Sequence, residues 1–175
     1  MSEQPGRYQR SFRGMVGAMV VLLGVVALFV TFRDLNRNDP ADPVKSVDYR
    51  SPARFAREEA RFPLLAPRRL PEGWIATSVR FENVRDQAWH VGFLTDDRRY
   101  VGLEQADESA GTMVEEFVGE DAQQGEDVTV AGVAWETWTA PDDDRALVRE
   151  QPAVTTLVVG PVPQATLEDF IATLE

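Results

Sequence analysis

The side chain best suited to acid–base chemistry in this chain is its single histidine, His90. It lies between Trp89 and Val91 in an alternating stretch that is typical of a β-strand. A zinc site would need further His or Cys ligands, and the chain has neither a second histidine nor a cysteine. No G-x-S-x-G motif supplies a nucleophile. We therefore expect His90 to be a solvent-facing strand residue, and the sequence predicts no catalytic residue, no metal site and no cofactor.

Two other groups of polar residues are weak candidates for chemistry. The only lysine, Lys45, precedes the folded region, so a Ser-x-x-Lys or Schiff-base site has no candidate. The triplet Asp142-Asp143-Asp144 offers oxygen ligands, but it lacks the alternating ligand positions, the glycine and the distant glutamate of a calcium loop. The Pro-Asp-Asp-Asp run is more simply a hairpin turn.

The four tryptophans are the remaining candidates for a binding site. Trp74 and Trp89 are expected in the core, whereas Trp135 and Trp138 are three residues apart and would face opposite sides of one strand. Aromatic walls are common in clefts that bind apolar ligands. Trp135 and Trp138 are therefore the predicted binding residues.

A separate feature, the uncharged run at residues 14–32, predicts a membrane-spanning helix. Its nineteen residues would span about 28 Å, close to the thickness of the hydrocarbon core. A cleaved signal peptide would have a shorter apolar region followed by small residues, but Arg33 and Asp34 follow here. A buried core helix would show one polar face, and this run has none. We expect the chain to contact the lipid bilayer through these residues.

The orientation of this span follows less directly from charge. Arg7, Arg10 and Arg13 precede it and Arg33 and Arg37 follow it, so the positive charges are nearly balanced. A short basic tail before an apolar run also matches an uncleaved signal-anchor. We therefore expect residues 1–13 to form a cytoplasmic tail at the plasma membrane, with the rest of the chain after the span outside the cytoplasm.

Charge is unevenly distributed beyond the span. Residues 100–175 contain 2 arginines against 17 acidic residues, and the whole chain has a net charge of −11. Such a surface repels phosphate backbones, so no nucleic-acid partner is expected.

Hydrophobic periodicity divides the rest of the chain into a linker and one domain. Residues 33–46 are polar and contain Pro40 and Pro43, which is typical of a stalk. Residues 47–175 predict an α+β domain in which an antiparallel sheet is covered by a few short helices. Strands are expected at 75–81, 89–94, 100–105, 127–130, 133–138, 145–149 and 155–159. Helices are expected at 51–60, 111–118 and 166–174.

Several stretches also carry a family resemblance. At Leu70-Pro71-Glu72-Gly73-Trp74, with residues 89–93, 100–105 and 158–160, the chain resembles a family of single-pass actinobacterial membrane proteins that carry a domain of unknown function. The resemblance covers most of the chain, the anchor included. It implies a cytoplasmic N-terminus and an exported domain, and it brings no catalytic residues with it.

These observations predict a membrane-anchored, extracytoplasmic domain that binds an envelope protein or an apolar ligand at the bacterial cell envelope. The alternative is an enzyme that acts on an envelope glycan through paired carboxylates, which would have to lie about 5–10 Å apart. The two differ in whether a Glu or Asp lies in a concave site beside a tryptophan.

Overall fold

The computed structural model of the chain describes residues 14–17, 19, 22, 26, 44–83 and 87–175. The chain divides into two compact units, Met1–Pro43 and Val44–Glu175. Within the predicted span 14–32, the described residues are helical. The rest of that span, the 1–13 tail and linker residues 33–43 lie outside the described residues. Within the described ranges, no helix combines the length and the apolar composition that a membrane crossing requires.

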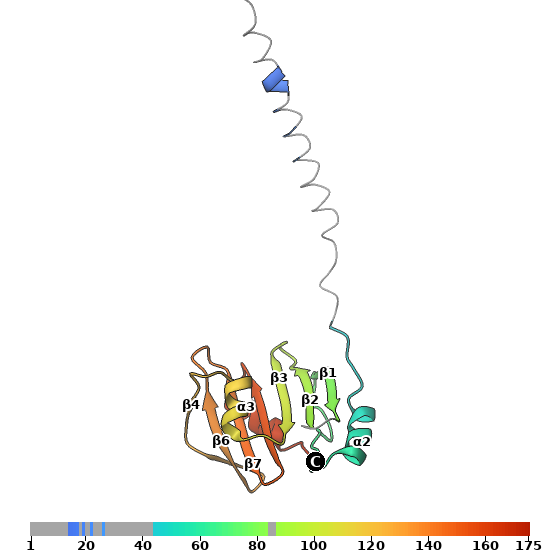
Figure 1. Ribbon diagram of the computed structural model, residues 1–175, viewed down its shortest axis with the longest axis vertical. Coiled ribbons are helices and arrows are strands. Elements are labelled where there is room, and N and C mark those ends of the chain that lie inside the picture. Colours follow the sequence, from blue (N-terminus) through green and yellow to red (C-terminus); the bar gives the residue numbers. More distant parts are fainter. Residues whose placement is uncertain (1–13, 18, 20–21, 23–25, 27–43, 84–86) are drawn as a thin grey trace, which may run out of the picture. The chain divides into compact units, whose positions relative to one another are not determined.

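The second unit is built on one antiparallel sheet (Figure 1). Its strand order is β1-β2-β3-β8-β7-β6-β4, and β5 pairs with β6 beside that path. The central strand β8 is buried along its whole length and is rich in β-branched residues, as expected of a strand covered on both faces. The strands are β1 (Ile75–Glu82), β2 (Ala88–Leu94), β3 (Tyr100–Ala106), β4 (Gln123–Gln124), β5 (Val128–Val130), β6 (Val133–Thr139), β7 (Arg145–Gln151) and β8 (Val154–Gly160).

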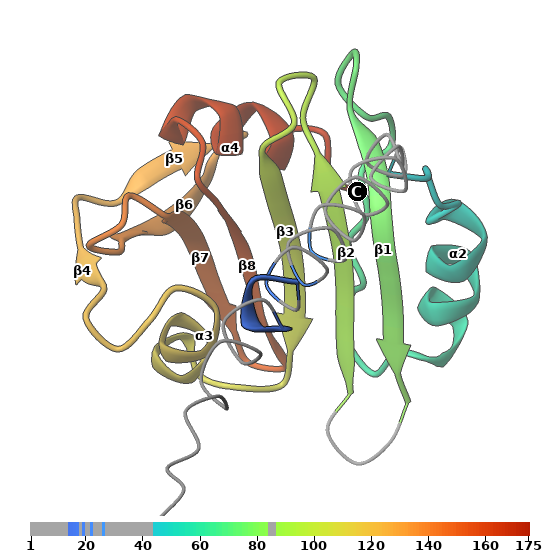
Figure 2. The same cartoon turned by 90° about the horizontal axis from the view of Figure 1, so that it is seen from above.

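Three helices cover this sheet unequally. We define the first face as the one that packs against α2 (Arg50–Glu59) and α4 (Gln164–Ile171), where the larger core cluster lies. The second face carries α3 (Ala110–Phe117), which packs against β7 and β8. Figure 2 shows α3 beside β7 and away from β1–β3. The part of the second face formed by β1–β3 is therefore not covered by any of these three helices, and we call it the open half.

The α+β class with an antiparallel sheet is confirmed, and the differences from the predicted elements are local. The helix expected at 51–60 is α2, at Arg50–Glu59, and its Ala53 and Ala56 are buried in the core. Tyr49 is its N-cap, and Asp48 accepts a hydrogen bond from the Arg50 amide at 2.9 Å. The short strand β4 was not predicted, since two glutamines show no periodicity.

Candidate functional site

Strand register brings three polar side chains together on the open half. Arg80 of β1 pairs with His90 of β2, and His90 pairs with Glu104 of β3. Ser78 is two residues before Arg80 and therefore projects from the same face. The register of β1 shifts between Ala76 and Ser78, which is the kind of local irregularity that changes the direction of a side chain.

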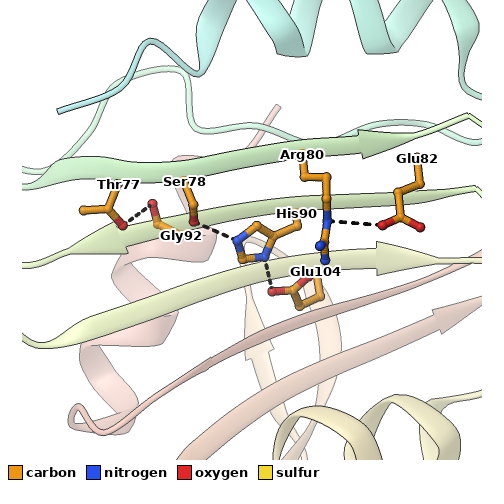
Figure 3. Close-up of polar contacts among 7 residues, drawn as sticks. All are labelled: Thr77, Ser78, Arg80, Glu82, His90, Gly92 and Glu104. Carbon is orange, nitrogen blue, oxygen red and sulfur yellow. Dashed lines mark hydrogen bonds and ion pairs between the residues drawn. The ribbon is translucent and has the colours of Figure 1, made fainter. Parts of the chain in front are cut away.

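Ser78, His90 and Glu104 form a continuous hydrogen-bonded row across the three strands (Figure 3). The Ser78 hydroxyl lies 2.8 Å from His90 Nε2, and His90 Nδ1 lies 2.5 Å from Glu104 Oε1. When Glu104 is ionised, Nδ1–H donates to the carboxylate, and a neutral His90 then accepts the Ser78 proton at Nε2. The row therefore holds His90 in one tautomer and one orientation.

Glu104 is the most enclosed member of the row, with a side chain that is 7% exposed, whereas the His90 side chain is 20% exposed. Burial raises the pKa of the Glu104 carboxyl, and its hydrogen bond and charge interaction with His90 oppose that rise. The positive charge of Arg80 also acts to lower this pKa, and Figure 3 shows the Arg80 side chain extending toward the row. The carboxylate is thus costly to ionise without its basic neighbours.

Tyr100 completes the cluster by lying over two glycines that face each other on β2 and β3. Gly92 pairs with Gly102, and a Cβ atom added to either would come within 3.0 Å of a Tyr100 ring or hydroxyl atom. The two glycines therefore provide the space for the outer end of the ring. Tyr100 is 39% exposed, and burial, followed by the nearby charge of Glu104, raises its pKa to about 12. Its hydroxyl stays protonated and can donate a hydrogen bond at neutral pH.

The order Ser–His–Glu is that of a nucleophilic triad, but the surrounding backbone differs from that of a hydrolase. A triad enzyme needs donors aimed at the developing oxyanion, usually backbone N–H groups. In a sheet, the backbone N–H groups lie in the plane of the strands and not above the face on which Ser78 projects. What the cluster offers on this face is a set of oriented donors and acceptors beside an aromatic ring.

The sequence predicted His90 as a strand residue of this face but missed its partners. The strands expected at 89–94 and 100–105 are close enough along the chain to form a hairpin, and the register of that hairpin places Glu104 across from His90. Ser78 carried no comparable signal. Ser78 lies on β1 and contacts His90 on β2 just after a register shift in β1, and no residue pattern predicts that shift.

The two predicted binding tryptophans lie on opposite faces of β6, as strand alternation predicts. Trp135 belongs to the core cluster of the first face and is 3% exposed, and its buried indole Nε1 has no hydrogen-bond partner within the described part of the chain. Trp138 is partly buried against the second-face cluster, and its Nε1 donates to Glu136 at 3.2 Å. They do not share one site, and neither belongs to the open half.

The aspartate triplet forms the expected turn between β6 and β7. Asp143 has a φ of 72°, the Ala140 amide donates to the Asp144 carbonyl, and Asp143 pairs with Arg145 at 3.4 Å. The described residues contain no group of three or more His, Cys, Asp or Glu side chains that could hold a metal ion. Lys45 is exposed and lies outside the helices and strands.

A hollow of about 640 Å³ beside the second-face cluster is lined by several carboxylates, among them Glu136 and Glu150. Glu136 pairs with Val148, so Glu150 is the diagonal neighbour of Glu136 on the same face. The backbone positions of diagonal neighbours are about 7–8 Å apart. Glu136 accepts the Trp138 indole hydrogen bond, and Glu150 accepts one from the Ala110 amide at 2.8 Å, where α3 begins. Here a carboxylate lies in a concave site next to a tryptophan.

Comparison with known proteins identifies the chain at the level of a family. No curated protein matches it. The model of one family, described as a protein of unknown function (DUF4245), matches residues 7–174, nearly the whole chain. The chain therefore belongs to the DUF4245 family of proteins of unknown function.

Proposed function

We propose that this protein is a single-pass membrane protein whose domain of residues 47–175 lies outside the cytoplasm and binds a ligand or partner of the bacterial cell envelope. The uncharged run at 14–32 and the basic tail before it support the anchor and the signal-anchor topology. The resemblance to single-pass actinobacterial membrane proteins supports the same arrangement.

Reporter fusions test this topology directly. An enzyme that is active only outside the cytoplasm, joined after Glu175, should be active in cells, and a reporter that is active only in the cytoplasm should be silent at the same position. The opposite pattern would overturn the proposed orientation. Extraction of the fusion from membranes by carbonate alone would overturn the anchor.

The proposed ligand is a neutral, hydroxyl-rich molecule such as an envelope glycan, bound on the open half. The observation that carries this proposal is the Tyr100 ring lying over Gly92 and Gly102 beside the Ser78–His90–Glu104 row. A partly exposed aromatic ring provides apolar contact, and the oriented polar groups around it can donate to and accept from hydroxyls. Binding sites commonly combine these two features.

Charge favours a neutral ligand over an anionic one. The chain has a net charge of −11, so polyanions would be repelled at long range. On the open half itself, the charge of Arg80 is paired with Glu82 at 3.3 Å. Hydroxyl groups need neither a net positive field nor a free cation, because they form hydrogen bonds with neutral partners.

Titration with neutral oligosaccharides of glucose and of N-acetylglucosamine tests this proposal in the full chain in nanodiscs. Signals from the open half should shift saturably, and Tyr100→Ala should weaken binding by about tenfold or more, since stacking and hydrogen bonds are both lost. Tyr100→Phe should bind more tightly than Tyr100→Ala because it keeps the ring. Absence of binding for both sugars, or equal binding by wild type and Tyr100→Ala, would overturn it.

A second candidate function is hydrolysis of an envelope glycan by paired carboxylates. It is favoured by the hollow that contains Glu136 and Glu150 near Trp138, because their diagonal register puts two carboxylates on one face of the sheet, as a paired-carboxylate mechanism requires. Release of new reducing ends from envelope glycan by the full chain would support it. Glu136→Gln and Glu150→Gln should each abolish that release, whereas Glu126→Gln, an exposed residue outside the hollow, should not.

A further inference from the structure

A pocket on the first face, separate from the open half, combines apolar walls with two polar groups that have no partner among the residues that the structure describes. Its volume is about 130 Å³. Val130 and Val133 line it from the β5–β6 hairpin, and Ile171 and Leu174 line it from the end of α4 and the residues after it. Trp135 of β6 and Arg149 of β7 are its polar members.

The indole of Trp135 is the first of these polar groups. The residue is 3% exposed, and its Nε1 is the only buried side-chain nitrogen or oxygen among the described residues that has no hydrogen-bond partner. Leaving a buried donor unpaired costs about 1–3 kcal/mol, and native proteins contain few such donors. By contrast, the fully buried Trp89 donates its Nε1 proton to the Leu65 carbonyl at 2.9 Å.

The guanidinium of Arg149 is the second polar group. Arg145 and Arg149 are the only basic residues after position 99. Arg145 pairs with Asp143 and donates to the Val162 carbonyl, whereas the Arg149 guanidinium forms no ion pair or hydrogen bond with another described residue. Arg149 is half-buried, so its charge is only partly screened by water.

Strand register places these two groups next to each other. Glu136 and Val148 form the last pair of the β6–β7 ladder, and Trp135 and Arg149 are the next residues beyond it on the two strands, both lining the pocket. If the ladder continued by one residue, the two side chains would be directly opposed, a position at which Cβ atoms are about 4.5–5.5 Å apart. Two donors, one of them charged, therefore lie together beside a small apolar pocket.

We infer that this pocket binds a small carboxylic acid with a short, branched aliphatic body. The carboxylate pairs with Arg149 and accepts a hydrogen bond from the Trp135 indole, while the aliphatic body packs against Val130 and Ile171. A guanidinium favours a carboxylate because it can donate two parallel hydrogen bonds to it. The volume limits the body to a few carbons, since a cavity of about 150 Å³ holds one benzene molecule.

The test uses 3-methylbutanoate as the probe and the full chain, labelled with ¹⁵N, in nanodiscs. The readout is the indole signal of Trp135, assigned through its loss in Trp135→Phe. We expect a saturable shift of this signal with the acid, and binding at least about tenfold weaker with 3-methylbutan-1-ol, which keeps the body and lacks the charge. Absence of a saturable shift up to about 10 mM acid would overturn the inference.

Two arginine variants on the same strand separate binding from folding. Arg149→Gln should weaken binding of the acid by about tenfold or more and leave the alcohol unaffected. Arg145→Gln removes the same charge from a residue that does not line the pocket, and it should leave binding of the acid unchanged. Equal weakening by both variants, or equal binding of acid and alcohol by the wild type, would overturn the inference. Should Arg149→Gln fail to fold, Arg149→Lys keeps the charge and should retain binding.

Discussion

The second face of the sheet consists of two halves built from the same alternation but with opposite chemistry. Under α3, β7 and β8 present apolar residues to this face, among them Val148 and Leu157, which are fully buried. The polar residues of these strands on the same face, Glu150 and Thr155, bond to the backbone of Ala110 and Glu108, where α3 begins. On β1–β3, the corresponding positions carry Ser78, His90 and Tyr100. Whether a strand position carries an apolar or a polar side chain therefore depends on whether a helix covers it, because burying apolar area is favourable only where another element removes it from water.

Glu104 lies at the border between the two halves and shows properties of both. Its strand β3 pairs with β2 on one side and with the central strand β8 on the other, and Glu104 itself lies between His90 and Leu157. The residue is 6% exposed, as in the covered half, yet it is hydrogen-bonded to the polar row. Burial and the polar row therefore act on one carboxyl in opposite directions, which makes its pKa a sensitive reporter of the border.

The largest expected difference between the halves is in the cost of removing a leucine. Leu157→Ala should lower the free energy of unfolding by about 2–5 kcal/mol, because Leu157 is fully buried under α3. Leu94→Ala, on the open half and half-buried, should lower it by less than about 1 kcal/mol. Urea unfolding measures both. Equal losses would mean that the open half is covered as completely as the other.

A smaller effect is expected from adding one carbon at Gly92. In Gly92→Ala, the Cβ atom would collide with the Ser78 hydroxyl and approach Tyr100 Cε2 at 3.0 Å, so we expect a loss of about 1–3 kcal/mol. The control is Gly111→Ala in α3, where the nearest atom is 3.9 Å away and alanine favours the helix. A neutral Gly92→Ala variant would show that the cluster is not packed as described.

Removing the Ser78 hydroxyl should cost less again. Ser78→Ala breaks one hydrogen bond to His90 on a half-exposed surface, and we expect a loss of about 0.5–1.5 kcal/mol in unfolding free energy. Thermal unfolding measured alongside the His90 ring signals would check this. A loss of about 3 kcal/mol or more would place the row in the core rather than on an open surface.

The smallest effect at neutral pH is expected for Glu104→Gln. It should change the free energy of unfolding by less than about 1 kcal/mol, because the amide oxygen can still accept a hydrogen bond from His90. The pKa of Glu104 is raised by folding, so its protonated form favours the native state. The contribution of Glu104 to wild-type stability is therefore fully present below the pKa that this carboxyl has in the unfolded chain. It is lost as the pH rises through the higher pKa that the carboxyl has in the folded protein. The free energy of unfolding of Glu104→Gln minus that of the wild type, measured by urea unfolding at several pH values, should therefore rise from pH 4 upward. A decrease of this difference with rising pH would contradict the raised pKa.

Much of the fold was predictable because it depends on local patterns. Period-two alternation located seven of the strands, and the apolar face of residues 166–174 located α4. The helix expected at 166–174 is α4 at Gln164–Ile171, so its predicted boundaries were two residues late at the start and three at the end, and Pro163 is the N-cap. The site was less predictable, since only His90 of its row stood out by residue type.

The sequence by itself determined which segments are strands, which face of each is apolar, and where the acidic charge concentrates, because these properties depend on neighbours along the chain. The tertiary structure alone decided that Ser78 meets His90, that Tyr100 lies over a glycine pair, and that Trp135 and Arg149 line one pocket. Those contacts join residues on different strands. They depend on register shifts and on which half of the sheet a helix covers, and both are set by packing the whole domain at once.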